Sequence, residues 1–366
     1  MKAWSYREID WPRLRSRYAA WWRGELETPL FYIATQPHVA LEPRPHEHEA
    51  VKKWFMDPQT RIPREVALNR GRWYYADGFP TIDIARINIG QAAFYGCPAH
   101  FANETIWLDP LLDSWDGWEE KIRFDPDNEL WRLTVAQARL AVEMAAGEMA
   151  ITTLGGFDGV LDNLATMRGV ENALTDVLDH PEQALALERR FLDDFRTVYF
   201  TLYNIIKDNP CGVTTWNRAL MTEGPVHCMQ SDFSCMIAPR LFRRLGKWYL
   251  EEQAGLFAKV LYHLDGTNAL QHLPILCAIA KLDGIQVVYQ VPHGKRITEL
   301  MESWHQIAAA GKRIEIWAQN PQELADVLPF LEMRPSKGLK LNLFPQDREA
   351  ADALVDGIAR LGYPLE

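Results

Sequence analysis

Hydrophobic positions in the second half of the chain follow two alternating patterns. Short apolar runs rich in branched residues lie at 226–230, 259–263, 285–290, 313–317 and 339–343. Between them, apolar residues recur at three- and four-residue steps over 239–257, 268–281, 297–310, 321–331 and 346–361. Because the first pattern is typical of buried strands and the second of amphipathic helices, this half predicts strands alternating with helices.

The first half continues the alternation less regularly. We expect helices over 5–24, 129–146, 161–178 and 181–208, and strands over 30–34, 149–154 and 212–216. The stretch 36–64 is rich in Pro, His and Glu and predicts a loop with one helical turn, and 77–113 predicts irregular structure. An eighth strand comes from either 30–34 or the region 82–87, and about eight strands close a (β/α)8 barrel.

The predicted fold is therefore α/β, a (β/α)8 TIM barrel over residues 76–366 that follows a helical and irregular extension over 1–75. Most of the 14 tryptophans lie in the first third of the chain. They either pack the extension against the barrel or line a pocket for a flat or apolar ligand. A doubly wound open sheet is the alternative fold, but no GxGxxG motif follows any predicted strand.

Composition narrows the class of protein. The net charge of −10 argues against nucleic-acid binding, which needs a basic face. The five cysteines are odd in number and irregularly spaced, which argues against a disulfide framework and favours a cytoplasmic protein. We expect no membrane association, because no stretch approaches the ~18 consecutive apolar residues of a membrane span.

Polar residues at strand ends are the candidates for chemistry, because active sites of such barrels lie at the carboxyl ends of the strands. His263 and Asp265 follow the apolar run 259–262 and are two residues apart, so they share one face of the strand. The pair could bind a metal, hold a substrate or act as an acid and base. The structural alternative is a hydrogen-bonded histidine and a helix cap at Asp265 or Thr267.

Further candidates follow other predicted strands. Asp158, which follows the run 149–154, and Asp232, which follows 226–230, are candidate catalytic carboxylates. Five residues are candidate substrate contacts, and each has a structural alternative as a packing, rim or turn residue: Trp107, Gln230, Gln290, His227 and Asp77.

Four segments resemble the uroporphyrinogen decarboxylase-like superfamily. They are GGFDGVLDNLATMRG at 155–169, DHPE at 179–182, QSDFSCMIAP at 230–239 and YHLDG at 262–266. This superfamily includes corrinoid-dependent methyltransferases and is related to cobalamin-independent methionine synthase. The resemblance implies a (β/α)8 barrel with a deep cleft at the strand ends, and it runs from about residue 75 to the C-terminus.

The chain departs from both branches of that superfamily. The methyltransferases hold zinc with a His-x-Cys pair and a later cysteine, and the matching positions here are His263, Asp265 and Asn342. The resemblance therefore implies at most one divalent metal, zinc or a harder ion, on His263 and Asp265. The arginine-rich loop with which the decarboxylases bind propionate groups is missing from the sequence.

Two hypotheses follow. The first is an enzyme that cleaves or transfers a one-carbon unit on a small organic substrate, with decarboxylation placed ahead of methyl transfer because the thiolate ligands are missing; a corrinoid protein is a possible partner of the methyl-transfer version. The second is a non-catalytic ligand-binding barrel whose tryptophan-rich third forms a homodimer or partner surface.

Overall fold

A computed structural model of the chain describes residues 3–40, 42–84, 90–103, 105–153, 159–217, 220–288, 300–318, 323, 325, 337–363 and 365. The strands are β1 (Leu30–Ala34), β2 (Tyr74–Ala76), β3 (Thr81–Ile82), β4 (Ala99–Phe101), β5 (Ile106–Leu108), β6 (Ala150–Thr152), β7 (Val213–Thr214), β8 (Val226–Gln230), β9 (Lys259–Leu264), β10 (Gly284–Val287), β11 (Arg313–Ala318) and β12 (Leu339–Leu343).

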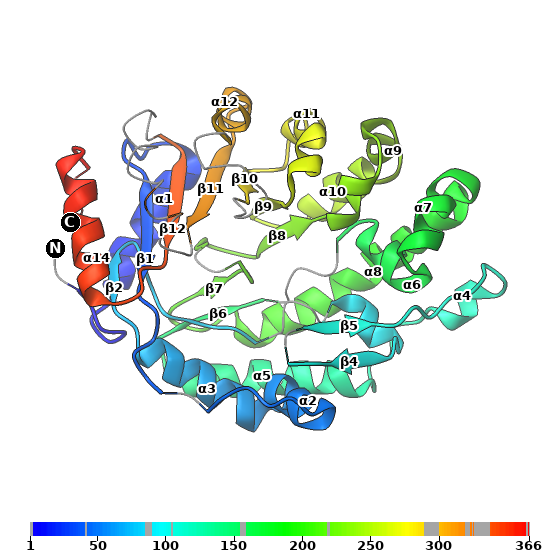
Figure 1. Cartoon of the computed structure of the whole chain (residues 1–366), viewed down its shortest axis with the longest axis horizontal. Helices are drawn as coiled ribbons and strands as arrows, with labels where there is room; N and C mark the ends of the chain where they lie inside the picture. The colour runs from blue at the N-terminus through cyan, green and yellow to red at the C-terminus, as the bar shows by residue number, and fades with distance from the viewer. Residues whose placement is uncertain are drawn as a thin grey trace.

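The helices surround the strands (Figure 1). They are α1 (Trp11–Arg23), α2 (His48–Met56), α3 (Pro58–Arg70), α4 (Trp118–Lys121), α5 (Glu129–Ala145), α6 (Asp162–Arg168), α7 (Val170–Asp179), α8 (Pro181–Ile206), α9 (Pro239–Leu245), α10 (Lys247–Ala254), α11 (Leu273–Cys277), α12 (Met301–Ala309) and α14 (Arg348–Arg360), with short 3-10 helices η1 (Gln91–Tyr95), η2 (Asp232–Met236) and η3 (Thr267–His272).

The central sheet is parallel. Seven strands are hydrogen-bonded in the order β2-β1-β12-β11-β10-β9-β8, in which only β2 runs antiparallel to its neighbour. A second sheet, β3-β6-β7, is also parallel, and its strand β7 contacts β8. The strands curve so that the helices lie outside them (Figure 1). The described strand pairs do not close into a complete ring, so the structure shows a mixed α/β, barrel-like arrangement.

Most of the predicted elements are confirmed, and three strands, β1, β8 and β12, match the predicted bounds. The loop predicted over 36–64 is wrong, because α2 and α3 occupy much of it. Proline at the first turn and at Pro63 obscures the helical pattern of α3, although Ile62 and Val66 are buried against α5. The helix predicted over 161–178 is broken at Gly169, whose φ of +77° ends α6.

The extension predicted over 1–75 contributes to the sheet and closes one end of it. Its strand β1 pairs in parallel with β12, the last strand of the chain. Its helix α1 packs Tyr18 and Trp21 against buried strand residues such as Leu261. The Arg313 guanidinium, at the first residue of β11, donates to the carbonyl of Trp21 at 2.7 Å. Helix α1 therefore covers the amino-terminal ends of the strands, opposite the end where the candidates were predicted.

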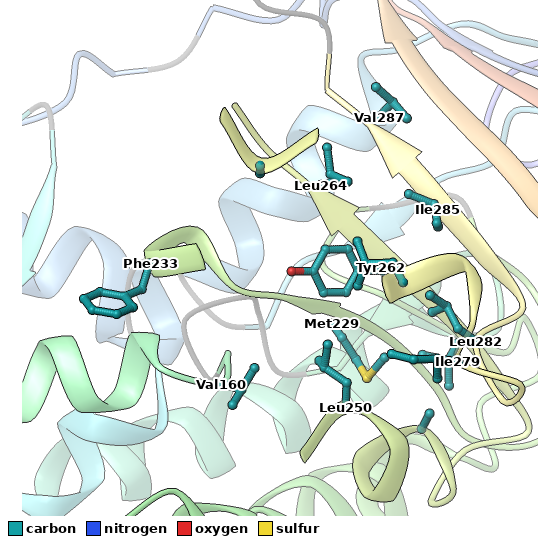
Figure 2. Packing of buried hydrophobic residues seen from close by; sticks show 14 of the residues in the cluster. Val160, Met229, Phe233, Leu250, Tyr262, Leu264, Ile279, Leu282, Ile285 and Val287 are labelled. Carbon is teal, nitrogen blue, oxygen red and sulfur yellow. The ribbon is translucent and has the colours of Figure 1, made fainter. Parts of the chain in front are cut away.

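The two faces of the sheet carry different side chains. Tyr262, Leu264, Ile285 and Val287 pack with apolar residues of the helices outside the sheet (Figure 2). Because side chains alternate along a strand, the residues between them, such as His263 and Gln286, point to the inner face. The inner face is thus available for polar side chains.

Candidate active site

A row of five polar residues crosses the inner face of the sheet. Strand register pairs Gln230 with His263, His263 with Gln286, Gln286 with Glu315, and Glu315 with Lys340. The row therefore lies at one level of five adjacent strands, β8 to β12. Except for His263, which is 16% exposed at its side chain, these residues are buried.

The Glu315 carboxylate accepts four hydrogen bonds from neighbouring side chains. Its Oε1 accepts N–H bonds from Gln286 Nε2 at 2.9 Å, Asn217 Nδ2 at 3.0 Å and Trp317 Nε1 at 2.9 Å. Its Oε2 accepts from Lys340 Nζ at 2.6 Å, and both side chains of this ion pair are 0% exposed. Asn217 follows β7, which is not adjacent to β11, so its bond crosses the interior enclosed by the curved sheet.

The Lys340 ammonium has two further partners. It donates to Asn342 Oδ1 at 2.5 Å and lies over the Tyr32 ring, 5.8 Å from its centroid. Burial lowers the pKa of Lys340, and the Glu315 carboxylate opposes this change. The ion pair is the reason that two charged groups are tolerated inside the sheet, because an unpaired buried charge would cost several kcal/mol.

His263 lies at the exposed end of the row. Its Nδ1 is hydrogen-bonded to Gln286 Oε1, and its Nε2 lies 3.8 Å from Asp265 Oδ2. The Trp216 ring meets the imidazole edge-on, with 5.0 Å between centroids. Burial opposes the charged form of the imidazole, but the Asp265 carboxylate, the hydrogen bond with Gln286 and the negative charge of Asp232 give a net rise in the pKa of His263.

Asp232 and Asp162 bring two more carboxyl groups to this end of the sheet. The side chain of Asp162 accepts backbone N–H bonds from Asp232 at 3.1 Å and Phe233 at 2.7 Å, and so holds η2 in place. Burial and the neighbouring Asp232 raise the pKa of Asp162, and burial likewise raises that of Asp232. A Cβ at Gly159 would lie 2.3 Å from the Asp162 carboxylate, so only glycine fits there.

Glu188 supports the same region from α8. It is fully buried and accepts backbone N–H bonds from Leu161 at 2.9 Å and Leu164 at 3.1 Å, at the start of α6. Burial raises the pKa of Glu188 from 4.5 to about 8 despite these bonds. The folded protein therefore holds a proton that the unfolded chain releases near pH 4.5, and the associated stability is lost as the pH rises through about 8.

We expect Glu188→Gln to flatten the pH dependence of stability between pH 5 and 9, since glutamine keeps the acceptor oxygen but cannot ionise. The pKa shift corresponds to roughly 3–5 kcal/mol of unfolding free energy. Denaturant unfolding across this range measures the difference. Glu252→Gln is the control, because Glu252 forms an exposed pair with Arg189 and has a lowered pKa, so its effect lies below pH 5. Equal slopes for wild type and Glu188→Gln would contradict the prediction.

The structure brings together four of the predicted site residues, His263, Asp265, Asp232 and Gln230. Gln230 Nε2 lies 3.3 Å from Asp232 Oδ2 and is in register with His263. Two predicted residues, Asp158 and Gln290, lie outside the described residues. The pairing of Gln286 with His263 and the roles of Asp162, Glu315 and Lys340 were not expected from the sequence.

The other three predicted substrate contacts lie elsewhere. His227 packs on the outer face of β8 among Phe195, Tyr199 and Phe257, and burial lowers its pKa to about 3. Its neighbour in sequence, Cys228, lies on the opposite face of β8, in the apolar cluster that contains Leu261 and Trp21. The position of His227 follows from strand alternation and is that of a core histidine.

Asp77 and Trp107 also lie away from the row. Asp77 is bound by Arg17, with 2.5 Å from Nε to Oδ1, and accepts the backbone N–H of Phe31, which ties α1 to β1 at the amino-terminal end of the sheet. Trp107 stacks on His100 in the β4–β5 hairpin and is 48% exposed. Asp77 therefore has a structural role, and Trp107 lines a surface groove formed with α6 and α7.

The described residues do not fit the zinc centre that the resemblance implied. His263 Nε2 and Asp265 Oδ2 are close enough to approach one ion, but within the described part of the chain no group of three or more His, Cys, Asp and Glu side chains is arranged to hold a metal. The thiol of Cys235 is also unsuited to zinc, because burial together with Asp232, Asp162 and Asp265 raises its pKa and so disfavours the thiolate that zinc binds.

Comparisons with known proteins give a likeness of fold. No known protein family matches the sequence, and no curated protein sequence matches it. The structure is similar to that of a methyltransferase from Methanosarcina mazei, with a TM-score of 0.61 over 96% of this chain and 99% of that one, at 10% sequence identity. An intracellular xylanase from Thermoanaerobacterium saccharolyticum has a TM-score of 0.36 at 12% identity, over 84% of this chain and 90% of that one, which is too low to support an argument.

Two further findings concern the helices and the cysteines. Within the described ranges, every helix is too short or too polar to span a bilayer. All five cysteines are described, and none of them forms a disulfide.

Proposed function

We propose that this protein is a methyltransferase of the (β/α)8-barrel type, acting on a small organic substrate at the carboxyl ends of its strands. The observation that carries the proposal is the position of His263, whose Nε2 lies beside Asp265 while its Nδ1 is fixed by Gln286. The overall likeness to a methyltransferase supports the choice among reactions.

His263 would act as the proton donor. A methyl group bound to a substrate heteroatom passes to an acceptor nucleophile, and the heteroatom takes the bonding electron pair. The Nε2 proton of the imidazolium then goes to that heteroatom, so that CH3–X–R, nucleophile anion and imidazolium give CH3–nucleophile, H–X–R and neutral imidazole. The raised pKa of His263 favours the protonated form that this step requires.

Electrostatics favours methyl transfer over the decarboxylation that was placed first from the sequence. Asp265 and Asp232 lie beside His263, so a substrate carboxylate would meet acidic side chains there rather than a free cation. Lys340 brings a positive charge to the row, but Glu315 and Asn342 occupy it. The site therefore suits a neutral or positively charged methyl compound better than a carboxylic acid.

A labelled methyl group tests the proposal. Purified protein is incubated with small molecules carrying CD3 on oxygen, sulfur or nitrogen, with cob(I)alamin or a thiol as acceptor, and products are measured by mass spectrometry. We expect CD3 on an acceptor with the wild type. No transfer from any of the three substrate classes would overturn the proposal and favour the non-catalytic barrel. Transfer to cob(I)alamin but not to thiol would support the corrinoid protein as partner.

We expect Asp265→Asn to move the alkaline limb of the pH–rate profile to lower pH. The general acid is active below its pKa, and the Asp265 carboxylate, 3.8 Å from Nε2, raises that pKa through its negative charge. The measurement is kcat against pH for wild type and variant. Asp109→Asn is the matched control, because Asp109 pairs with an exposed histidine, His100, at 2.5 Å outside the site. A limb that stays in place in Asp265→Asn would exclude Asp265 as the partner of the acid.

A further inference from the structure

The hydrogen bonds along the row have a fixed direction. Glu315, paired with the Lys340 ammonium, can only accept bonds, and its Oε1 already faces Gln286 Nε2 at 2.9 Å. The Gln286 amide must therefore turn its NH2 group to Glu315, which leaves its carbonyl oxygen facing His263. A carbonyl oxygen only accepts, so His263 Nδ1 must donate.

We propose that the buried Glu315–Lys340 ion pair, acting through Gln286, fixes the tautomer of His263, and that Glu315 and Gln286 are positioning residues. The imidazole then keeps its proton on Nδ1 in both its neutral and its charged form. Every proton that His263 gains or loses is confined to Nε2, the nitrogen that faces Asp265. Free histidine in water prefers the other tautomer, with the proton on Nε2, so the row reverses the intrinsic preference.

The ion pair is suited to this task because its donor and acceptor groups cannot exchange roles by rotation of a side chain. Amide groups can exchange their oxygen and nitrogen by a half turn, but a carboxylate has no donor and an ammonium has no acceptor. Lys340 sets an amide next to the row in the same manner, since Asn342 presents its oxygen to the ammonium. Two further N–H groups, from Asn217 and Trp317, hold the carboxylate of Glu315 in place.

Histidine ring nitrogens report the tautomer directly in two-bond ¹H–¹⁵N correlation spectra. The chain has 10 histidines, and the signals that disappear in His263→Ala identify His263. The spectrum is recorded at a pH where this imidazole is neutral. We expect the proton on Nδ1 in the wild type, and on Nε2 in Gln286→Met, which keeps the shape of glutamine but removes the acceptor. Thermal unfolding confirms that each variant is folded.

Asn217→Ala is the matched control, because it removes an N–H bond to the same Glu315 oxygen without touching Gln286. It should leave the proton on Nδ1. Glu315→Gln is a second variant, in which both amides can turn, and a mixture of tautomers is expected. A wild-type proton on Nε2, or an unchanged tautomer in Gln286→Met, would overturn the inference.

The role of this tautomer in catalysis rests on the proposed function, but the spectra measure the tautomer independently of that function. If His263 carries its proton on Nδ1 and no methyl transfer is found, the proposed function alone fails. If methyl transfer is found, Gln286→Met should lower kcat roughly 10- to 100-fold with KM nearly unchanged, because outer-shell partners of this kind orient the ring rather than bind the substrate. An unchanged kcat would show that the orientation has no part in the reaction.

Discussion

His263→Ala is expected to lower the rate of methyl transfer by roughly 10²- to 10⁴-fold, the usual contribution of a positioned general acid. The imidazole is the one group of the row that is partly exposed, at 16% of its side chain, and it is held from both sides by Gln286 and Asp265. The loss should fall on kcat, because the proton moves only as the leaving group departs. Single-turnover transfer of the labelled methyl group measures it.

His100→Ala provides the comparison. His100 also pairs with an aspartate, Asp109, but its side chain is 41% exposed and lies on the β4–β5 hairpin. Its loss should leave the rate unchanged, whereas equal rates for wild type and His263→Ala would remove His263 from the mechanism. Unfolding curves separate a chemical effect from a loss of structure.

Lys340→Met should lower the free energy of unfolding by roughly 3–5 kcal/mol, because the substitution leaves the Glu315 carboxylate charged, buried and without its ion-pair partner. Methionine fills the space of the lysine stem, so the cost arises from charge rather than from a cavity. Urea unfolding at neutral pH measures the change.

Lys337→Met is the matched control, since Lys337 forms an exposed pair with Glu27, with 55% and 78% of the side chains exposed. That change should cost less than about 1 kcal/mol. The double variant Lys340→Met with Glu315→Leu should recover part of the loss, because no buried charge remains. A loss below about 1 kcal/mol in Lys340→Met would mean that the interior solvates Glu315 in another way.

The strands were predictable because their buried runs are short, branched and apolar, and the alternation of side chains placed His263 and Asp265 on one face. Helices α2 and α3 could not be predicted in this way, because proline and charged residues mask their apolar faces. Glu315 and Lys340 each lie in strands that alternate charged and apolar residues, a pattern typical of strands with one face in water. Only the register of β11 against β12 shows that the two charges meet inside.

The pairing of β1 with β12 has a consequence for the synthesis of the protein. Residues 30–34 leave the ribosome roughly 300 residues before their partner at 339–343, which is about 15–60 s at ordinary rates of translation. Until then, one edge of β1 has backbone groups without their final partners, and such an edge is prone to pair with other chains. Completion of the sheet must therefore be a late event in folding, and expression at lower protein concentration should favour the folded chain over aggregates.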